Sequence, residues 1–356
     1  MRWDDLRLDD EQVAAATGGP VPLLPRGAVS RTFDTPEFRG MTFHEVTARS
    51  ALNKVPDASR MPFRWTINPY RGCGMACRYC FARKTHEYLD LDSGHDFDSQ
   101  IVVKTNVGEV LHRELARPSW QHEHVAMGTN VDCYQRVEGR YRLMRDILPA
   151  LTEVANPFSI LTKGALILRD LDLLEAAARV TDVSAALSIG SVYRELRGKV
   201  EPGAPPPARR LDVVRQLNDA GIRCGVLMAP ILPFLSDSDE QLDATVEAIA
   251  AAGAAYVSPI VLHLRPGARE WWQAWLRREH PDLLPRYAEL YGVRAYAPKA
   301  YQRDVSDRVH ALAARHKVGR QRQLRSGDGH RLAASTSRAA PANAKPRSRA
   351  EQLSML

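Results

Sequence analysis

The sequence predicts an α/β fold in which short strands and helices alternate through most of the chain. The chain has 356 residues, and its hydrophobic fraction of 44% is enough to form a sizeable core. Six short apolar segments lie between residues 64 and 264, and each precedes a segment with helical periodicity. Strands that alternate with helices in this way form parallel sheets. No apolar stretch approaches the roughly 18 charge-free residues of a membrane helix, which argues against a membrane protein.

The predicted strands are apolar runs bounded by turn signals. The first covers residues 64–67 and ends at the turn signal Asn68-Pro69-Tyr70. The last, residues 255–264, is apolar almost throughout, as buried parallel strands are. The strands between them are residues 124–128, 158–162, 183–189 and 222–228.

The predicted helices have apolar residues that recur every three to four positions. One begins at Ser238, with Gln241 as its capping-box partner, and ends at Gly253. Gly221 is a suitable C-cap for a helix over residues 210–220. The other predicted helices cover residues 107–116, 136–154 and 168–179, and prolines keep residues 202–207 in a loop.

The segments on either side of this core suggest four units in all. Trp271, Trp272 and Trp275 have the spacing of a helix face and favour a core position, although aromatic side chains of this kind also stack on bases. The four predicted units are an N-terminal extension (1–62) of no assignable fold, the strand–helix core (63–266), a helical C-terminal segment (267–318) and a disordered basic tail (319–356).

The formal charge of +7 is concentrated in the tail. Residues 319–356 contain eight basic and two acidic residues, and therefore six of the seven net charges. Such a tail can contact nucleic acid, or it can be merely a solvated end. The first ten residues are acidic and lack the apolar region of a secretory signal, so we expect a cytoplasmic protein.

Three of the five cysteines lie within eight residues, as Cys73, Cys77 and Cys80. An odd, clustered set of cysteines does not fit a disulfide framework. A zinc site with His86 as fourth ligand is one interpretation, because structural zinc takes four Cys or His ligands. An iron–sulfur cluster is the other, because soft thiolates suit such clusters.

The C-x3-C-x2-C spacing, with Tyr79 just before the last cysteine, resembles the signature of the radical S-adenosylmethionine (SAM) superfamily. The resemblance implies a partial (β/α)6 barrel and one [4Fe-4S] cluster held by Cys73, Cys77 and Cys80. It also implies that SAM binds the open iron and that a one-electron reductant of the flavodoxin or ferredoxin type supplies the electron. Cleavage of SAM would then yield methionine and a 5′-deoxyadenosyl radical that abstracts hydrogen from a substrate.

Further segments resemble the spore photoproduct lyase-like branch, and in particular its bacterial relatives of unassigned function. Cys133 and Cys224 are isolated, which argues against a second cysteine-bound cluster. The similar segments include Asn68-Pro69-Tyr70-Arg71-Gly72-Cys73, Gly128-Thr129-Asn130-Val131-Asp132, Leu161-Thr162-Lys163 and Glu201-Pro202.

The resemblance also implies roles for residues that would contact SAM. Tyr79 would contact the adenine, Lys163 the SAM carboxylate, and Ser188 the amino-acid portion of SAM. Glu201 and Arg210 are weaker candidates for the ribose or the substrate. Each has a structural alternative, such as a core tyrosine, a surface lysine or a buried serine bonded to backbone.

The candidate catalytic residues are Cys133 and the preceding Asp132. Lyases of this branch use a cysteine as hydrogen-atom donor after the second strand, but the matching position here holds Thr129. Cys133 is either a displaced donor or a buried small side chain. His86 and Glu87 either transfer protons or position the loop.

These observations predict a radical SAM enzyme that acts on an unidentified substrate. Nucleic acid is one candidate for that substrate, in a lyase- or repair-like reaction. The alternatives are a radical SAM enzyme that modifies a small molecule or peptide, and a non-catalytic zinc-binding module.

Overall fold

The computed structural model describes residues 23–57, 59 and 61–319, and its centre is a seven-stranded sheet. The strand order is β11-β10-β9-β8-β7-β4-β3. Neighbouring strands from β4 to β11 are parallel, whereas β3 pairs with β4 in the antiparallel direction. The strands are β3 (Leu52–Lys54), β4 (Trp65–Ile67), β7 (Val125–Met127), β8 (Phe158–Thr162), β9 (Val183–Ser188), β10 (Arg223–Ile231) and β11 (Val257–Val261).

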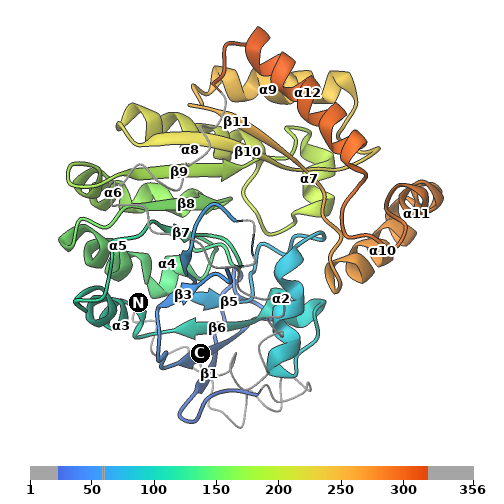
Figure 1. The fold of residues 1–356 in the computed structure, drawn as a ribbon. Coiled ribbons are helices and arrows are strands. Elements are labelled where there is room, and N and C mark those ends of the chain that lie inside the picture. Colours follow the sequence, from blue (N-terminus) through green and yellow to red (C-terminus); the bar gives the residue numbers. More distant parts are fainter. Residues whose placement is uncertain (1–22, 58, 60, 320–356) are drawn as a thin grey trace, which may run out of the picture.

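The six parallel strands confirm the predicted α/β fold with its strand–helix repeats. Each predicted strand overlaps one of them. The helices lie outside the sheet (Figure 1), where α8 contacts both β9 and β10 and α6 contacts β9. The helices around the strands are α3 (Val107–Leu115), α4 (Glu138–Tyr141), α5 (Met144–Glu153), α6 (Leu171–Ala178), α7 (Arg194–Val200), α8 (Pro207–Asp219) and α9 (Asp239–Ala251).

Two predicted helices are interrupted. The helix predicted over residues 136–154 is broken at Arg142, which has a left-handed φ of 56°. The buried Glu138 causes a new start, because its carboxylate accepts a hydrogen bond from the backbone N–H of Met144 at 3.1 Å. The segment 168–179 begins as the 3₁₀ helix η3 (Ala165–Asp170) before α6. By contrast, the predicted cap is confirmed, because Ser238 Oγ accepts from Gln241 N at 3.2 Å.

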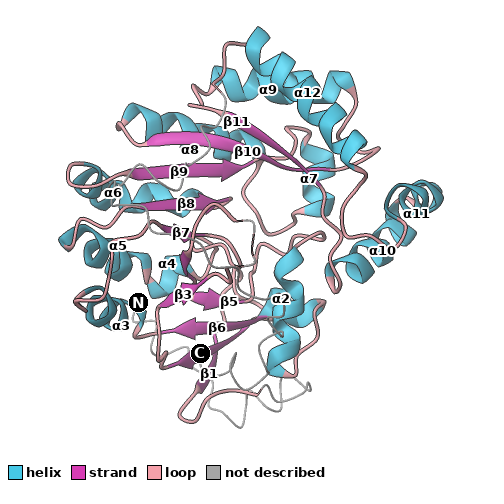
Figure 2. Cartoon of the chain, viewed as in Figure 1, coloured by secondary structure: helices cyan, strands magenta, loops and turns pink. Residues whose placement is uncertain are grey.

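A second, four-stranded sheet lies beside the first, and the sequence did not predict it. Its order is β1-β2-β6-β5, and β2 and β6 are its parallel pair. Figure 2 shows it below the main sheet, next to the helical segments that follow the cysteines. The elements are β1 (Val29–Thr32), β2 (Thr42–Val46), β5 (Tyr70–Arg71), β6 (Gln100–Lys104), the 3₁₀ helix η2 (Phe81–Leu89) and α2 (His95–Ser99).

The C-terminal helices α10 (Ala268–Glu279), α11 (Leu284–Tyr291) and α12 (Lys299–Arg315) follow the barrel, with the short 3₁₀ helix η4 (Pro281–Leu283) between α10 and α11. Trp272 and Trp275 are buried and stacked at 4.7 Å, which confirms their predicted core position, whereas the same prediction is wrong for the half-buried Trp271. α12 packs on α9 and β11 and so covers the end of the sheet. None of the helices within the described residues is both long and apolar enough to cross a membrane. Most of the predicted basic tail, residues 320–356, lies outside the described residues.

Candidate active site

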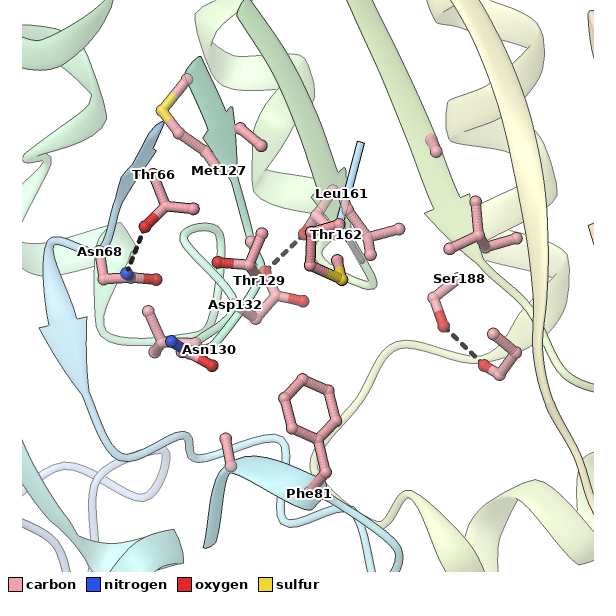
Figure 3. Close-up of a pocket in the computed structure, with 18 of the residues that line it drawn as sticks. Thr66, Asn68, Phe81, Met127, Thr129, Asn130, Asp132, Leu161, Thr162 and Ser188 are labelled. Carbon is pink, nitrogen blue, oxygen red and sulfur yellow. Dashed lines mark hydrogen bonds between the residues drawn. The ribbon is translucent and has the colours of Figure 1, made fainter. Parts of the chain in front are cut away.

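A cavity of about 1240 Å³ occupies the interior of the barrel and extends to the carboxyl ends of its strands. All six parallel strands contribute to its wall. Figure 3 shows Thr66, Thr129, Asp132 and Ser188 around this space, with Phe81 on its opposite side. Active sites of α/β barrels lie at this end of the strands, where loops bring side chains from different strands together.

The three clustered cysteines lie on the loop that follows β5, and all three line the cavity. Cys73 and Cys77 are buried, and Cys80 is half-buried. Burial raises the pKa of the Cys77 thiol to about 12, and the thiols of Cys73 and Cys80 are shifted in the same direction. The thiols therefore keep their protons unless a cation replaces them. A soft, positively charged group such as an iron–sulfur cluster fits this donor set.

Close backbone packing fixes the start of the cysteine loop. Gly72 has a φ of +85°, and a Cβ there would lie 2.8 Å from the carbonyl oxygen of Gln100. The amide of Gln135 bridges the loop, since its Nε2 donates to Gly72 O at 3.0 Å and its Oε1 accepts from Gly74 N at 2.9 Å. A larger residue at position 72 would displace the loop from β6.

The middle of the loop is held by backbone bonds to the last residue of α7 and to the segment that follows it. Arg78 N donates to Val200 O at 2.9 Å, and Gly203 N donates to Met75 O at 3.1 Å. A Cβ at Gly203 would lie only 2.1 Å from Gly74 O, so the two backbones touch. The proline-rich segment predicted as a loop thus serves as a support for the cysteines, although the loop ends at Pro206 because Pro207 is the first residue of α8.

The buried guanidinium of Arg83 secures the end of the loop. Its Nε and Nη2 both donate to Cys77 O, at 3.1 and 2.9 Å, and Nη2 also pairs with Asp98. Arg83 was not singled out in the sequence analysis. The side chain of Arg83 is fully buried, which indicates that it positions the loop. The sequence alone does not show whether a given arginine is buried.

A buried network joins Tyr79 to Glu201 and Arg210. The Tyr79 hydroxyl donates to the Glu201 carboxylate, which also forms an ion pair with Arg210. Burial opposes ionisation of Glu201, but Arg210 and Lys163 together with the hydrogen bonds to its carboxylate lower its pKa. Glu201 is therefore held as an anion inside the protein. Arg210 also donates to Ser188 O at 2.9 Å, which ties α8 to the end of β9.

Ser188 and Lys163 lie on the same side of the cavity as this network. Ser188 Oγ donates to Ala229 O at 2.8 Å, so its lone pairs remain as acceptors. Lys163 Nζ lies 5.8 Å from the centre of the Tyr79 ring. Burial opposes protonation of Lys163, but the nearby Cys77 and Glu201 raise its pKa. The Lys163 ammonium group thus lies between the cysteines and the network.

Asp132 lines the cavity, and its carboxylate accepts three hydrogen bonds that join two segments. It accepts from Thr162 Oγ1 at 2.5 Å, Lys163 N at 2.7 Å and Tyr134 N at 2.9 Å. These bonds fix the loop after β7 against the end of β8. The acceptor capacity of the carboxylate is therefore largely used within the protein.

Cys133 lies away from this surface. Its side chain is fully buried and is not part of the cavity lining, whereas Thr129 is. The direction of the chain explains the difference, because Asp132 turns toward the cavity and the next residue packs into the core. The hydroxyl of Thr129 has no hydrogen-bond partner among the described residues.

His86 is directed to the second sheet. Its Nε2 donates to Gln100 O at 2.8 Å, and its ring packs edge-on against Phe97. Burial lowers the pKa of His86 to about 4, so the imidazole is neutral. In the described part of the chain, no three His, Cys, Asp or Glu side chains converge on a single metal ion. The Nε2 atom of His86 is thus occupied, whereas the buried Nδ1 has no hydrogen-bond partner among the described residues.

Comparison with known proteins agrees with this geometry. A model of the radical SAM superfamily matches residues 67–249. The chain is 50% identical over 323 residues to the uncharacterized protein Rv2578c of Mycobacterium tuberculosis (strain ATCC 25618 / H37Rv), covering 89% of this chain and 93% of that protein. It is 29% identical over 195 residues to the uncharacterized protein MJ0683 of Methanocaldococcus jannaschii, covering 54% of this chain and 69% of that protein.

The fold is also similar to a solved structure. Spore photoproduct lyase complexed with dinucleoside spore photoproduct has a TM-score of 0.58 and 16% identity, covering 77% of this chain and 79% of the lyase. Members of the matched superfamily use a [4Fe-4S] cluster and SAM, and another structure of the lyase contains bound AdoMet. Because the superfamily model spans more than half of its residues, the chain belongs to the radical SAM superfamily.

Proposed function

We propose that Cys73, Cys77 and Cys80 bind the [4Fe-4S] cluster and that SAM binds beside it for reductive cleavage. One observation carries this proposal: three thiols on one loop, two of them buried and one half-buried, face a single cavity of about 1240 Å³ inside the barrel. When bound, the cluster and SAM supply one-electron chemistry that removes a hydrogen atom from a substrate. The chain itself positions these groups and excludes water from them.

Three side chains around the cysteines suit the binding of SAM. Tyr79 presents its ring, and Glu201 fixes the ring through the phenol hydroxyl. Lys163 offers an ammonium group for the SAM carboxylate, since it remains protonated beside Cys77. Ser188 offers acceptor lone pairs for the SAM amino group, because its own proton is directed to Ala229 O.

The two residues predicted to be catalytic receive different roles. We assign Asp132 as a positioning residue, since its carboxylate holds Lys163 N and Thr162 in place. Cys133 receives no role, because its buried thiol does not line the cavity. Among the described residues that line the cavity, the three cysteines proposed to hold the cluster are the only cysteines. A lyase reaction that needs a further cysteine as hydrogen donor therefore has no donor in this lining. A one-electron reductant is the partner that this chemistry needs.

Reductive cleavage of SAM tests the proposal. Anaerobically reconstituted wild-type protein, given SAM and dithionite, is expected to form 5′-deoxyadenosine, measured by liquid chromatography. The Cys77→Ala variant should bind less iron and form no product. Cys224→Ala is the matched control, because Cys224 is equally buried but lies in β10 outside the cavity lining. Wild-type protein that binds zinc in place of iron, or binds the cluster and forms no 5′-deoxyadenosine, would contradict the proposal.

A further inference from the structure

Two cations in the cavity wall, the buried Lys104 and the half-buried Arg71, have no anionic partner among the described residues. Lys104 at the end of β6 is only 5% exposed, and Arg71 of β5 has a buried Nη1 with no hydrogen-bond partner. Both residues line the cavity. Within the described residues, neither side chain forms an ion pair or a hydrogen bond. Buried charges are normally paired, so this arrangement suggests that a partner comes from outside the chain.

The pairing of β5 and β6 places the two cations on one face. Arg71 is opposite Val102, and Lys104 is two residues further along β6, so both side chains project to the same side of the sheet. Their charges repel, and Arg71 contributes to the low pKa of Lys104. Such a pair is unfavourable alone, but it matches a ligand that carries two negative charges.

The carboxylate that acts on Lys104 is occupied by other groups. Glu114 of α3 accepts from Ser50 Oγ at 2.7 Å and from the backbone N–H groups of Ala51 and Leu52 at 3.0 and 2.8 Å. Its charge is thus largely used to fix the chain before β3. It attracts Lys104 from a distance without forming an ion pair.

Most of the other charged side chains in the cavity wall are also cations. One carboxylate, Asp132, contributes to the described lining, and it is engaged with Thr162, Lys163 N and Tyr134 N. The cations of the lining are Lys54, Arg71, Lys104, Lys163, Arg223 and Arg265. In a cavity with low-dielectric walls, this excess of cations attracts an anion.

We propose that Arg71 and Lys104 form a phosphate-binding subsite, so that the substrate of this enzyme carries a phosphate group. The inference rests on the proposed function, because it takes the same cavity as the substrate site. A phosphate monoester carries close to two negative charges at neutral pH and matches two cations, whereas a carboxylate carries one. Asn68 also lines the cavity, where its Nδ2 donates to Thr66 Oγ1 at 3.4 Å and keeps a second N–H for a ligand.

Binding of inorganic phosphate to the full-length reconstituted protein tests the subsite. Isothermal titration calorimetry should show saturable phosphate binding to the wild type, and Arg71→Gln and Lys104→Met should each weaken it about tenfold or more. Arg113→Gln is the charge-matched control, because Arg113 is exposed on α3 and pairs with Glu109. Its phosphate affinity should stay within about twofold of the wild-type value, as expected for a charge outside the cavity.

Thermal unfolding distinguishes a ligand subsite from a structural pair. Lys104→Met removes a buried cation, so it should raise the melting temperature without phosphate and abolish the increase caused by phosphate. A variant that melts at a lower temperature than the wild type and binds phosphate equally well would overturn the proposal. So would wild-type protein that binds acetate as tightly as phosphate.

Two phosphate compounds distinguish the source of the group. Thymidine 5′-monophosphate carries a monoester, and the dinucleotide TpT carries a diester as in nucleic acid. Preferential binding of either compound supports a phosphate subsite if Arg71→Gln abolishes that binding. Binding that is unaffected by this variant counts against the subsite. SAM cleavage by the wild type is measured separately, so that loss of the subsite and failure of the radical chemistry give different results.

Discussion

At Glu201, a single carboxylate joins residues that are more than one hundred positions apart in the sequence. Tyr79 and Arg210 both bind it, and Arg210 continues to Ser188 O at 2.9 Å. Removing either partner would leave a buried charge or hydroxyl without a partner. The network therefore orients Tyr79 next to the cysteines before any ligand binds.

Lys104 leads to a prediction about pH. Burial, followed by repulsion from Arg71, lowers its pKa from 10.5 to about 8, and Glu114 opposes the change. The unfolded chain therefore binds the proton more tightly than the folded chain between about pH 8 and 10.5. The cost of the buried cation is complete below pH 8 and disappears as the pH rises through this range.

The measurement is a comparison of wild type and Lys104→Met by urea unfolding from pH 7 to 10.5. The stability advantage of the variant should be on the order of 3 kcal/mol at pH 7 and decline above pH 8. Groups that titrate in this range without interacting with Lys104 are common to both proteins and cancel in the difference, whereas Arg71, with a pKa of about 10, is coupled to Lys104. An advantage that stays constant up to pH 10.5 would mean that Lys104 has an ordinary pKa.

The residues of the candidate site differ in how well their roles can be predicted from the sequence. The spacing of Cys73, Cys77 and Cys80 has chemical meaning by itself, and the structure places all three at one cavity. Cys133 shows the limit, because one position along a loop decides whether a thiol faces a cavity or the core. Arg71 and Lys104 could not be singled out, since the lack of a partner is a property of the folded chain.

At the scale of elements, the loop after α7 determines the shape of the cysteine loop. Gly203 touches the backbone of Gly74 and Met75, and a Cβ would lie 2.1 Å from Gly74 O. Gly203→Ala should therefore displace the cysteine loop and lower the iron content of reconstituted protein to less than half. Iron and sulfide analysis of the folded protein measures this loss.

Gly198→Ala is the control for this substitution. Gly198 lies in α7, and a Cβ there would meet nothing within 4 Å. Alanine favours a helix over glycine by roughly 1 kcal/mol, so this variant should keep its iron and unfold at the same or a slightly higher temperature. Equal iron content in the two variants would show that the contact at Gly203 does not support the cluster.

The elements themselves were predictable where their signal is local. The six parallel strands have short apolar runs, and the structure contains all six. The second sheet was missed because β5 has only two residues and because β2 pairs with β6, more than fifty residues away. The break at Arg142 was missed because the apolar pattern continues through it, while a distant buried contact of Glu138 with Arg169 helps to form the new helix start.

At the scale of the whole molecule, most of the net positive charge belongs to the C-terminal tail and not to the catalytic core. Eight basic and two acidic residues belong to residues 320–356, so the rest of the chain carries a formal charge of only +1 of the total +7. The cavity is nevertheless lined by more cations than carboxylates. Net charge therefore says little about the active site, and two distinct basic regions must be tested separately for contact with nucleic acid.

Deletion of residues 320–356 separates the two regions. The shortened chain keeps α12 and also the hydrogen bond from Val257 N to Gly319 O at 3.0 Å, which attaches the end of the described chain to β11. It should therefore fold and cleave SAM as the full chain does.

Loss of six net positive charges should weaken binding to single-stranded DNA, because each phosphate contact contributes about 0.7 to the slope of log affinity against log salt. Fluorescence anisotropy between 50 and 200 mM salt (about the range in which such contacts weaken strongly) measures both slopes. A slope unchanged by the deletion would show that the tail makes no phosphate contacts, and binding that then disappears in Arg71→Gln would place the nucleic acid in the cavity.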